Sequence, residues 1–167
     1  LFLWLNTSKR SITLDVATAT GRALALRLAA RCDAVVTDYR PSEAQRLRLA
    51  HHDFAAVNPR IVTTSVTAFG QSGPYADWLA TNLTSYAAGG QHYLTGEPER
   101  EPLQNGGYQA LYQAGTWAFG ATLAALWNAR EVGAGQQAEI AGQEVMAAIL
   151  EIFLPDYAYR KSEALTT

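Results

Sequence analysis

The chain has 167 residues, of which 49% are hydrophobic and 17% are charged, a composition typical of one globular domain with a sizeable core. Its formal net charge of −2 gives no electrostatic basis for binding nucleic acid. The single cysteine, Cys32, excludes an internal disulfide and a cysteine-based metal site. We therefore expect no metal and no nucleic acid, and a reducing, cytoplasmic location.

Neither apolar stretch of the sequence suits a membrane. Residues 1–5, LFLWL, are too short for the core of a signal peptide. Residues 114–127 have the length of a buried helix rather than of a membrane span. The chain opens at Leu1 without a methionine, and we expect it to be the interior of a longer protein whose first element is missing.

The first part of the chain alternates predicted strands with predicted helices. The predicted strands are SITLD (11–15), AVVTD (34–38) and RIVTTSV (60–66). Helices are predicted at 18–32, from Pro41 through 50, and over the residues before Pro59. The first of these helices carries Leu24, Leu28 and Cys32 on one face, which we expect to face the core. This order is typical of right-handed crossovers in a parallel sheet.

The second part is built around one long predicted helix at about 111–131. Phe119, Leu123 and Leu126 form a large apolar stripe along it. Four alanines form a second stripe that would let a sheet or helix approach closely: Ala114, Ala118, Ala121 and Ala125. A helix is also predicted at 81–90, a strand at 136–140, and a nearly all-apolar helix at 143–154 that requires a cover.

Ligands of parallel sheets bind beyond the carboxyl ends of the strands. The segments predicted there are 17–21, 38–42 and 67–74, which are rich in Gly, Ser, Thr and backbone N–H groups. Arg40 and Arg46 lie close by in the sequence, which suits a ligand that carries phosphate. Any α/β protein has such loops, and the chain contains neither a P-loop nor GxGxxG.

Four segments, in order, resemble the family III CoA-transferases, the group of formyl-CoA transferases and α-methylacyl-CoA racemases (CaiB/BaiF type). They are NTSKRSITLD, DAVVTDYRP, NPRIVTTSVTAFGQSGP, and GAGQQAEI behind the long helix. The resemblance implies an α/β fold: a Rossmann-like parallel sheet with flanking helices. Residues 1–167 would be part of the large domain, without its first strand and its C-terminal portion. It also implies an interlocked homodimer, or pairing with a second CoA-transferase half.

The resemblance further implies which residues contact CoA, a substrate rather than a permanently bound cofactor. Leu14 and Asp15 correspond to a strand end that holds CoA, and Asp38, Tyr39 and Arg40 correspond to a loop that does so. Arg46 corresponds to an arginine that reaches a phosphate, which a guanidinium can hold with two hydrogen bonds. Tyr39 either stacks on the adenine or covers the core.

The family's transferases use an aspartate carboxylate that attacks the acyl-CoA thioester and then carries CoA as an enzyme thioester. That aspartate precedes a glycine by four residues, and counting back from Gly115 gives Leu111, which cannot attack a thioester. Glu97, Glu99 and Glu101 lie nearest in the sequence and are most simply surface charges.

The aspartate and the histidine that the family's racemases use are also absent from the corresponding positions. The racemases' aspartate again falls at Leu111, and their histidine falls at Thr81. His92 has the wrong register.

The sequence thus predicts transfer of CoA between an acyl-CoA and a carboxylic acid, by a site without its usual nucleophile. The alternative is a non-catalytic CoA- or acyl-CoA-binding protein, or the partner-supporting half of a tandem or hetero-oligomeric enzyme.

Overall fold

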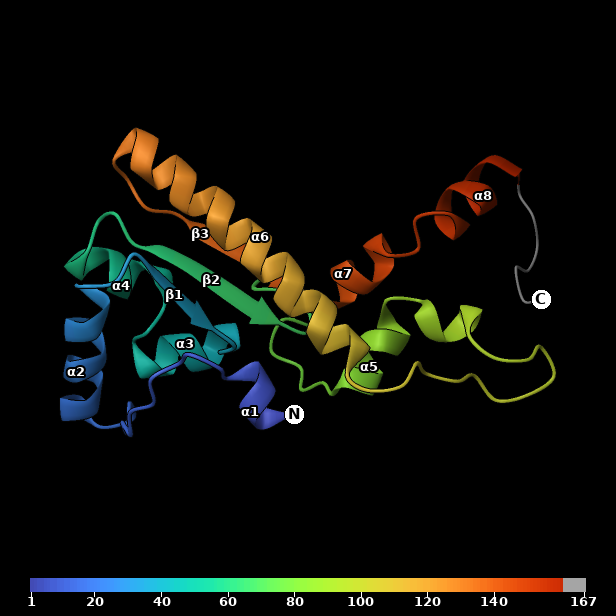
Figure 1. The fold of residues 1–167 in the computed structure, drawn as a ribbon, viewed down its shortest axis with the longest axis horizontal. Helices are drawn as coiled ribbons and strands as arrows, with labels where there is room; N and C mark the ends of the chain where they lie inside the picture. The colour runs from blue at the N-terminus through green and yellow to red at the C-terminus, as the bar shows by residue number, and fades with distance from the viewer. Residues whose placement is uncertain (161–167) are drawn as a thin grey trace.

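A three-stranded parallel sheet organises the chain in a computed structural model, which describes residues 1–160. The strands are β1 (Ala34–Thr37), β2 (Val62–Thr67) and β3 (Gln137–Ala141), in the order β1-β2-β3. Ala34 pairs with Val62, and Thr63 pairs with Gln137. β2 is therefore the central strand, and the predicted parallel α/β architecture is confirmed (Figure 1).

Helices surround this sheet and extend beyond it. They are α1 (Phe2–Leu5), α2 (Ala19–Ala29), α3 (Pro41–Leu47), α4 (His51–Val57), α5 (Asn82–Ala88), η1 (Gln91–Leu94), α6 (Gln109–Val132), α7 (Gly142–Ala148) and α8 (Phe153–Arg160). The N-cap Thr18 of α2 accepts a hydrogen bond from the N–H of Gly21, and Pro41 fits the first turn of α3. α6 ends at Gly133, whose φ of 80° a residue with a Cβ rarely adopts. Among the described helices, none is long and apolar enough to cross a membrane.

The alanine stripe of α6 packs on the sheet. The buried residues of this helix are all alanines: Ala110, Ala114, Ala118, Ala125 and Ala129. Ala125 and Ala129 contact Val62 of β2, and the hydroxyl oxygens of Thr64 and Thr122 lie 2.7 Å apart. The expectation that small side chains allow a close approach is confirmed. Of the large stripe, Phe119 (67% exposed) and Leu123 (50% exposed) face outward, whereas Leu126 is partly buried against the cluster of Val62, Ala125 and Ala129.

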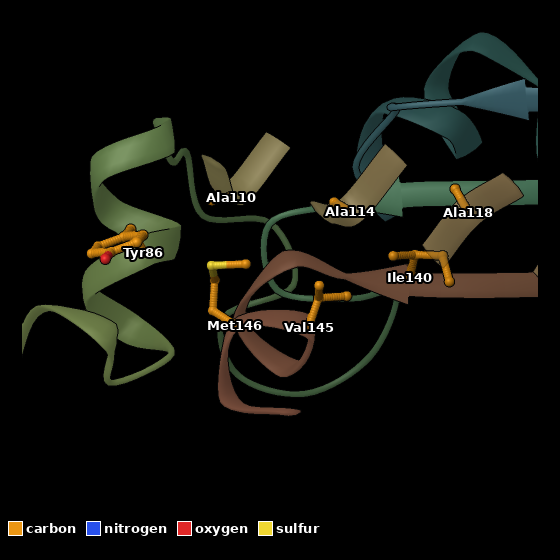
Figure 2. Packing of buried hydrophobic residues seen from close by; sticks show 7 residues of the cluster. All are labelled: Tyr86, Ala110, Ala114, Ala118, Ile140, Val145 and Met146. Atoms are coloured by element: carbon orange, nitrogen blue, oxygen red, sulfur yellow. The ribbon is translucent and has the colours of Figure 1, made fainter. Parts of the chain in front are cut away.

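The amino-terminal half of α6 shares a second cluster with α5 and α7. Figure 2 shows its seven residues converging from α5, α6, β3 and α7. Tyr86 and Met146 are among the most deeply buried large side chains, at 2% and 1% exposure. Gly89 is needed there because a Cβ at its position would overlap the side chain of Met146. This cluster fixes α5 against the beginning of α6.

A third cluster covers the other face of the sheet. It is formed by Ala29, Leu47, Leu49, Phe54 and Ile61. Val35 of β1 and the half-buried Tyr39 pack against it. The sheet thus has α6 on one face and the α2–α4 segment on the other, as Figure 1 shows.

The predicted strand at 11–15 is wrong. These residues form no strand in the structure, and all but Leu14 are exposed. Strand hydrogen bonds require a neighbouring strand, and within residues 1–160 no strand pairs with this segment. Alternating sequence alone does not supply that partner. The opening residues form the short helix α1.

The predicted core face of α2 is also wrong. Leu24 and Leu28 are 39% and 48% exposed, and Cys32 is exposed. Ala29 is buried instead, with Ala25 and Leu26 packed beside it. The helix carries apolar residues on more than one face, so its periodicity does not decide which face meets the sheet.

The predicted helix at 143–154 divides into α7 and α8, so the single-helix prediction is wrong. Val145 and Met146 of α7 are buried against α5 and α6, whereas Ile152 and Leu154 are 76% and 52% exposed. The helix ends where its contact with α5 and α6 ends, and no glycine or proline marks that point between 143 and 152.

We predict that Gly135→Ala destabilises the fold by about 1–3 kcal/mol, because its Cβ would overlap the carbonyl oxygen of Ile61. The N–H of Gly135 donates to Pro59 at 2.8 Å, which holds the α6–β3 loop against the start of β2. Gly120→Ala is the matched control: nothing lies within 4 Å, and helix propensity should raise stability by up to about 1 kcal/mol. Denaturant unfolding measures both, and equal effects would contradict this packing.

We predict that His51 makes stability fall as the pH drops below 6.5. Its Nδ1 lies 2.7 Å from the Thr63 hydroxyl, and burial, with a smaller effect of His52, lowers its pKa from 6.5. The unfolded chain then binds the proton more readily than the folded one, so acid favours unfolding. His51→Gln should flatten unfolding free energy between pH 7 and about pH 5, relative to wild type. His52→Gln, which removes only the smaller cause, should keep most of the slope.

Candidate functional site

A cavity of about 290 Å³ lies where β1 and β2 end. Its lining residues come from five regions: the end of β1, the end of β2 with the following loop, the start of α5, the start of α6, and the first residue of α7. They are Asp38, Arg40, Val66, Thr67, Ala68, Trp78, Leu79, Ala80, Thr81, Asn82, Ser85, Ala110, Leu111, Ala114 and Gly142. The position is the one expected for a ligand of a parallel sheet. Leu111, Asp38 and Arg40, which the sequence singled out separately, meet there.

The loop 69–74 shapes one side of this site through its backbone. Gly70 and Gly73 have φ values of 83° and 89°, a left-handed conformation that favours glycine. The Thr67 hydroxyl donates to the carbonyl of Gly70 at 3.0 Å, and the N–H of Gln71 donates to the Glu139 carboxylate on β3. A Cβ at Gly70 would crowd that carboxylate. The glycines are therefore required by the turn itself.

Arg40 lines the cavity but is already held by the protein. Its Nη1 donates to the carbonyl of Asp77 at 2.9 Å, and its Nη2 lies 3.9 Å from the carboxylate of Glu43. Asp77 in turn accepts a hydrogen bond from the N–H of Ser42 at 2.9 Å. Hydrogen bonds from Ser42 lower the pKa of the Asp77 carboxyl, with a smaller effect of Arg40. The start of α3 is thereby attached to the loop after β2.

Leu111 occupies the first turn of α6 and lines the opposite wall. Its side chain is 56% exposed, and its N–H donates to the Asn82 Oδ1 at 3.3 Å. Thr81, at the position of the racemases' histidine, is the N-cap of α5 and also lines the cavity. A leucine and a threonine offer neither a nucleophilic carboxylate nor a base, so neither of the family's usual acid–base arrangements is present at these positions.

The other predicted CoA contacts lie outside this cavity. Leu14 lines a separate cavity beside α2, and the Asp15 carboxylate accepts a hydrogen bond from Ala17. Tyr39 packs on the core cluster of the opposite face of the sheet. Arg46 lies on α3, 67% exposed and 3.7 Å from Glu43. The structure thus brings together Asp38, Arg40 and Leu111 and leaves these four apart from them; their contacts with an extended ligand stay predictions.

The remaining titratable candidates are not in the cavity lining. His92 lies in η1, with its ring 5.3 Å from that of Tyr86. Glu97, Glu99 and Glu101 are exposed in the turn beyond η1, which projects away from the sheet in Figure 1. Glu97 pairs loosely with Arg100 at 4.0 Å. Within residues 1–160, no three acidic, histidine or cysteine side chains gather in the manner of a metal site.

Sequence reasoning missed three residues that organise the site by accepting hydrogen bonds from the backbone. Asp77 and Glu139 accept backbone hydrogen bonds from Ser42 and Gln71, and Asn82 accepts one from Leu111. Each pair joins segments that are at least 29 residues apart, since the shortest separation is that of Asn82 and Leu111. Only the charge of the two acids could have drawn attention to them, Asp77 in the loop after β2 and Glu139 within β3.

Known proteins resemble this chain over most of its length. The model of "CoA-transferase family III" matches residues 1–166. The chain is 34% identical to succinyl-CoA–D-citramalate CoA-transferase of Chloroflexus aurantiacus, over 93% of this chain and 39% of that protein. It is 32% identical to the beta subunit of succinyl-CoA–L-malate CoA-transferase of the same organism, over 95% of this chain and 40% of that protein.

A solved structure agrees. The crystal structure of a CaiB/BaiF family protein from Brucella suis superposes with a TM-score of 0.90 at 32% identity, over 95% of this chain and 42% of that one. The chain thus spans about 40% of the length of these relatives. Because the family model covers nearly every residue and the fold agrees, the chain belongs to CoA-transferase family III.

Proposed function

We propose that the protein to which this chain belongs transfers CoA between an acyl-CoA and a carboxylic acid. The observation that carries the proposal is the cavity at the strand ends, where Arg40 and the start of α6 meet. Its walls are mostly apolar, with Trp78, Leu79 and Leu111 among them. Such a pocket suits the acyl end of a thioester, which needs exclusion of water and a few orienting donors.

The proposed CoA contacts follow from chemistry and position. Arg40 has its guanidinium at the cavity, where it can orient a carbonyl or phosphate oxygen while keeping its bond to Asp77. Arg46 projects from the next turn of α3 into solvent and is suited to a phosphate of the nucleotide end. Leu14, Asp15, Asp38 and Tyr39 complete the set as the resemblance implies it. CoA would be a substrate, with no permanently bound cofactor.

A second function is favoured by one observation, the leucine at the nucleophile position. With Leu111 more than half exposed in the cavity, the chain can bind a CoA thioester there without attacking it through residue 111. The alternative is therefore a non-catalytic CoA- or acyl-CoA-binding protein, or the half that supports a catalytic partner. One relative is a beta subunit by name, which supports the idea of a division between chains.

The assembly and location belong to the same proposal. We propose a homodimer or a pairing with a second CoA-transferase half, because exposed apolar side chains such as Phe119 and Trp127 line the outer face of α6. A cytoplasmic location rests on the single cysteine and on the CoA thioester substrate.

The deciding experiment combines a CoA titration with intact mass spectrometry of the full-length protein. Incubation with succinyl-CoA should give a hydroxylamine-sensitive adduct of CoA size if a carboxylate carries CoA. Binding without an adduct would favour the non-catalytic alternative. Absence of binding would contradict both.

We predict that Arg46→Gln weakens CoA binding about tenfold, because it removes one charge-assisted hydrogen bond, worth about 1.5 kcal/mol at an exposed position. Arg48→Gln is the matched control: it removes the same charge at the C-cap of the same helix. Isothermal titration with CoA measures both dissociation constants. An equal loss in the two variants would indicate general electrostatic attraction and contradict a specific role of Arg46.

We predict that Leu111→Asp creates a nucleophile at the start of α6. Succinyl-CoA should then produce a hydroxylamine-sensitive adduct that peptide mapping assigns to residue 111, because the side chain faces the cavity. Leu111→Asn keeps the size of the new side chain without its charge and should give no adduct there. Unchanged CoA binding with no adduct at residue 111 would show that this position does not face the thioester.

A further inference from the structure

We propose that Asp38 is the carboxylate that attacks the thioester in this cavity, in place of an acid at position 111. The inference rests on the proposed function and names the residue that performs it. Asp38 is the only carboxylate among the residues that line the cavity.

The alternation of β1 places Asp38 on the same face of the sheet as α6. Ala34 packs against the cluster that includes Ala125 and Ala129 of α6, whereas Val35 and Tyr39 pack against the cluster on the opposite face. Side chains alternate along a strand, so Asp38 follows Ala34 on the α6 side. Leu111 lies on α6, and the two residues line one cavity. The alternation of the strand and the lining of the cavity therefore both place Asp38 on the α6 side of the sheet.

The neighbouring carboxylates at this edge of the sheet are engaged. Asp77 accepts the hydrogen bond from the N–H of Ser42, and Glu139 accepts that of Gln71. Glu43 lies 3.9 Å from Arg40 and 3.7 Å from Arg46. These bonds reduce the electron density that an oxygen can offer to a carbonyl carbon.

Asp38 differs from these three acids. Its side chain is exposed and makes no hydrogen bond or ion pair within the part of the chain that the structure describes. The adjacent guanidinium of Arg40 is directed instead to Asp77 and Glu43. Among the described residues that line the cavity, Asp38 therefore offers a carboxylate whose oxygens are not already engaged by another group of the protein.

The reaction balances with the acyl-CoA and the acceptor acid alone. An Asp38 oxygen bonds to the thioester carbonyl carbon, and the C–S bond breaks with its electron pair leaving on CoA thiolate. The thiolate then bonds to the Asp38 carbonyl carbon, and the donor acyl group leaves as a carboxylate that carries the oxygen of Asp38. The acceptor carboxylate attacks the resulting aspartyl-CoA thioester, and the returning thiolate takes the acceptor acyl group and restores Asp38.

The test compares wild type, Asp38→Asn and Asp33→Asn in the full-length protein. Asp33 is a matched control because it is an exposed aspartate immediately before β1, at the opposite end of the same strand. Each protein is incubated with succinyl-CoA, and the adduct is measured by intact mass and located by peptide mapping. CoA titration reports in parallel whether each variant still folds and binds.

We expect a hydroxylamine-sensitive CoA adduct on the peptide with Asp38 in wild type and in Asp33→Asn. Asp38→Asn should lose the adduct entirely, even at a succinyl-CoA concentration that saturates the variant. Because Asp38 is also among the proposed CoA contacts, a weaker CoA affinity of this variant is compatible with the role as long as the adduct is absent at saturation. An adduct on another residue, an adduct that survives in Asp38→Asn, or CoA binding with no adduct in wild type would each overturn the role of Asp38 and leave CoA binding intact. Absence of CoA binding in wild type would overturn the proposed function, and this inference with it.

Discussion

The close approach of α6 to the sheet is the constraint on which the remaining structure depends. Alanines at 110, 114, 118, 125 and 129 are buried beneath the helix, and the Thr64–Thr122 contact of 2.7 Å joins it to the central strand. The methyl side chains of these alanines allow the helix to approach the sheet closely. Because α6 lies so near, its first turn reaches the carboxyl ends of β1 and β2, and Leu111 shares a cavity with Asp38.

The cavity is then completed by backbone hydrogen bonds rather than by side-chain packing. Asp77 accepts a hydrogen bond from the N–H of Ser42 in α3, Glu139 accepts one from the N–H of Gln71 in the loop after β2, and Gly70 and Gly73 supply the turns. A carboxylate that accepts such a hydrogen bond is less available to act as a nucleophile. An exposed and unpaired Asp38 is consequently distinct from its neighbours, although all of them are aspartates or glutamates near the same sheet edge.

Elements whose local pattern agrees with their surroundings were predictable. The strands at 34–38, 60–66 and 136–140 and the long helix have patterns that only one packing satisfies, and they occur with shifts of a few residues. The prediction of a strand at 11–15 was wrong because a strand needs a partner that the described residues do not provide. The helix at 143–154 failed because apolar composition continues past the point where packing ends. The prediction that Leu24 and Leu28 face the core was wrong because α2 is apolar on more than one face.

The sequence by itself determined the family, the parallel α/β arrangement and the absence of an acid at position 111, since each depends on residue identity and spacing along the chain. Tertiary structure alone decided which residues share the cavity: Asp38 and Leu111 are 73 positions apart, and their meeting requires both the alternation of β1 and the depth at which α6 sits. It also decided that, among the described acids at this edge of the sheet, Asp77 and Glu139 accept hydrogen bonds whereas Asp38 accepts none. Those properties arise from contacts between distant segments, and no local pattern of residues encodes them.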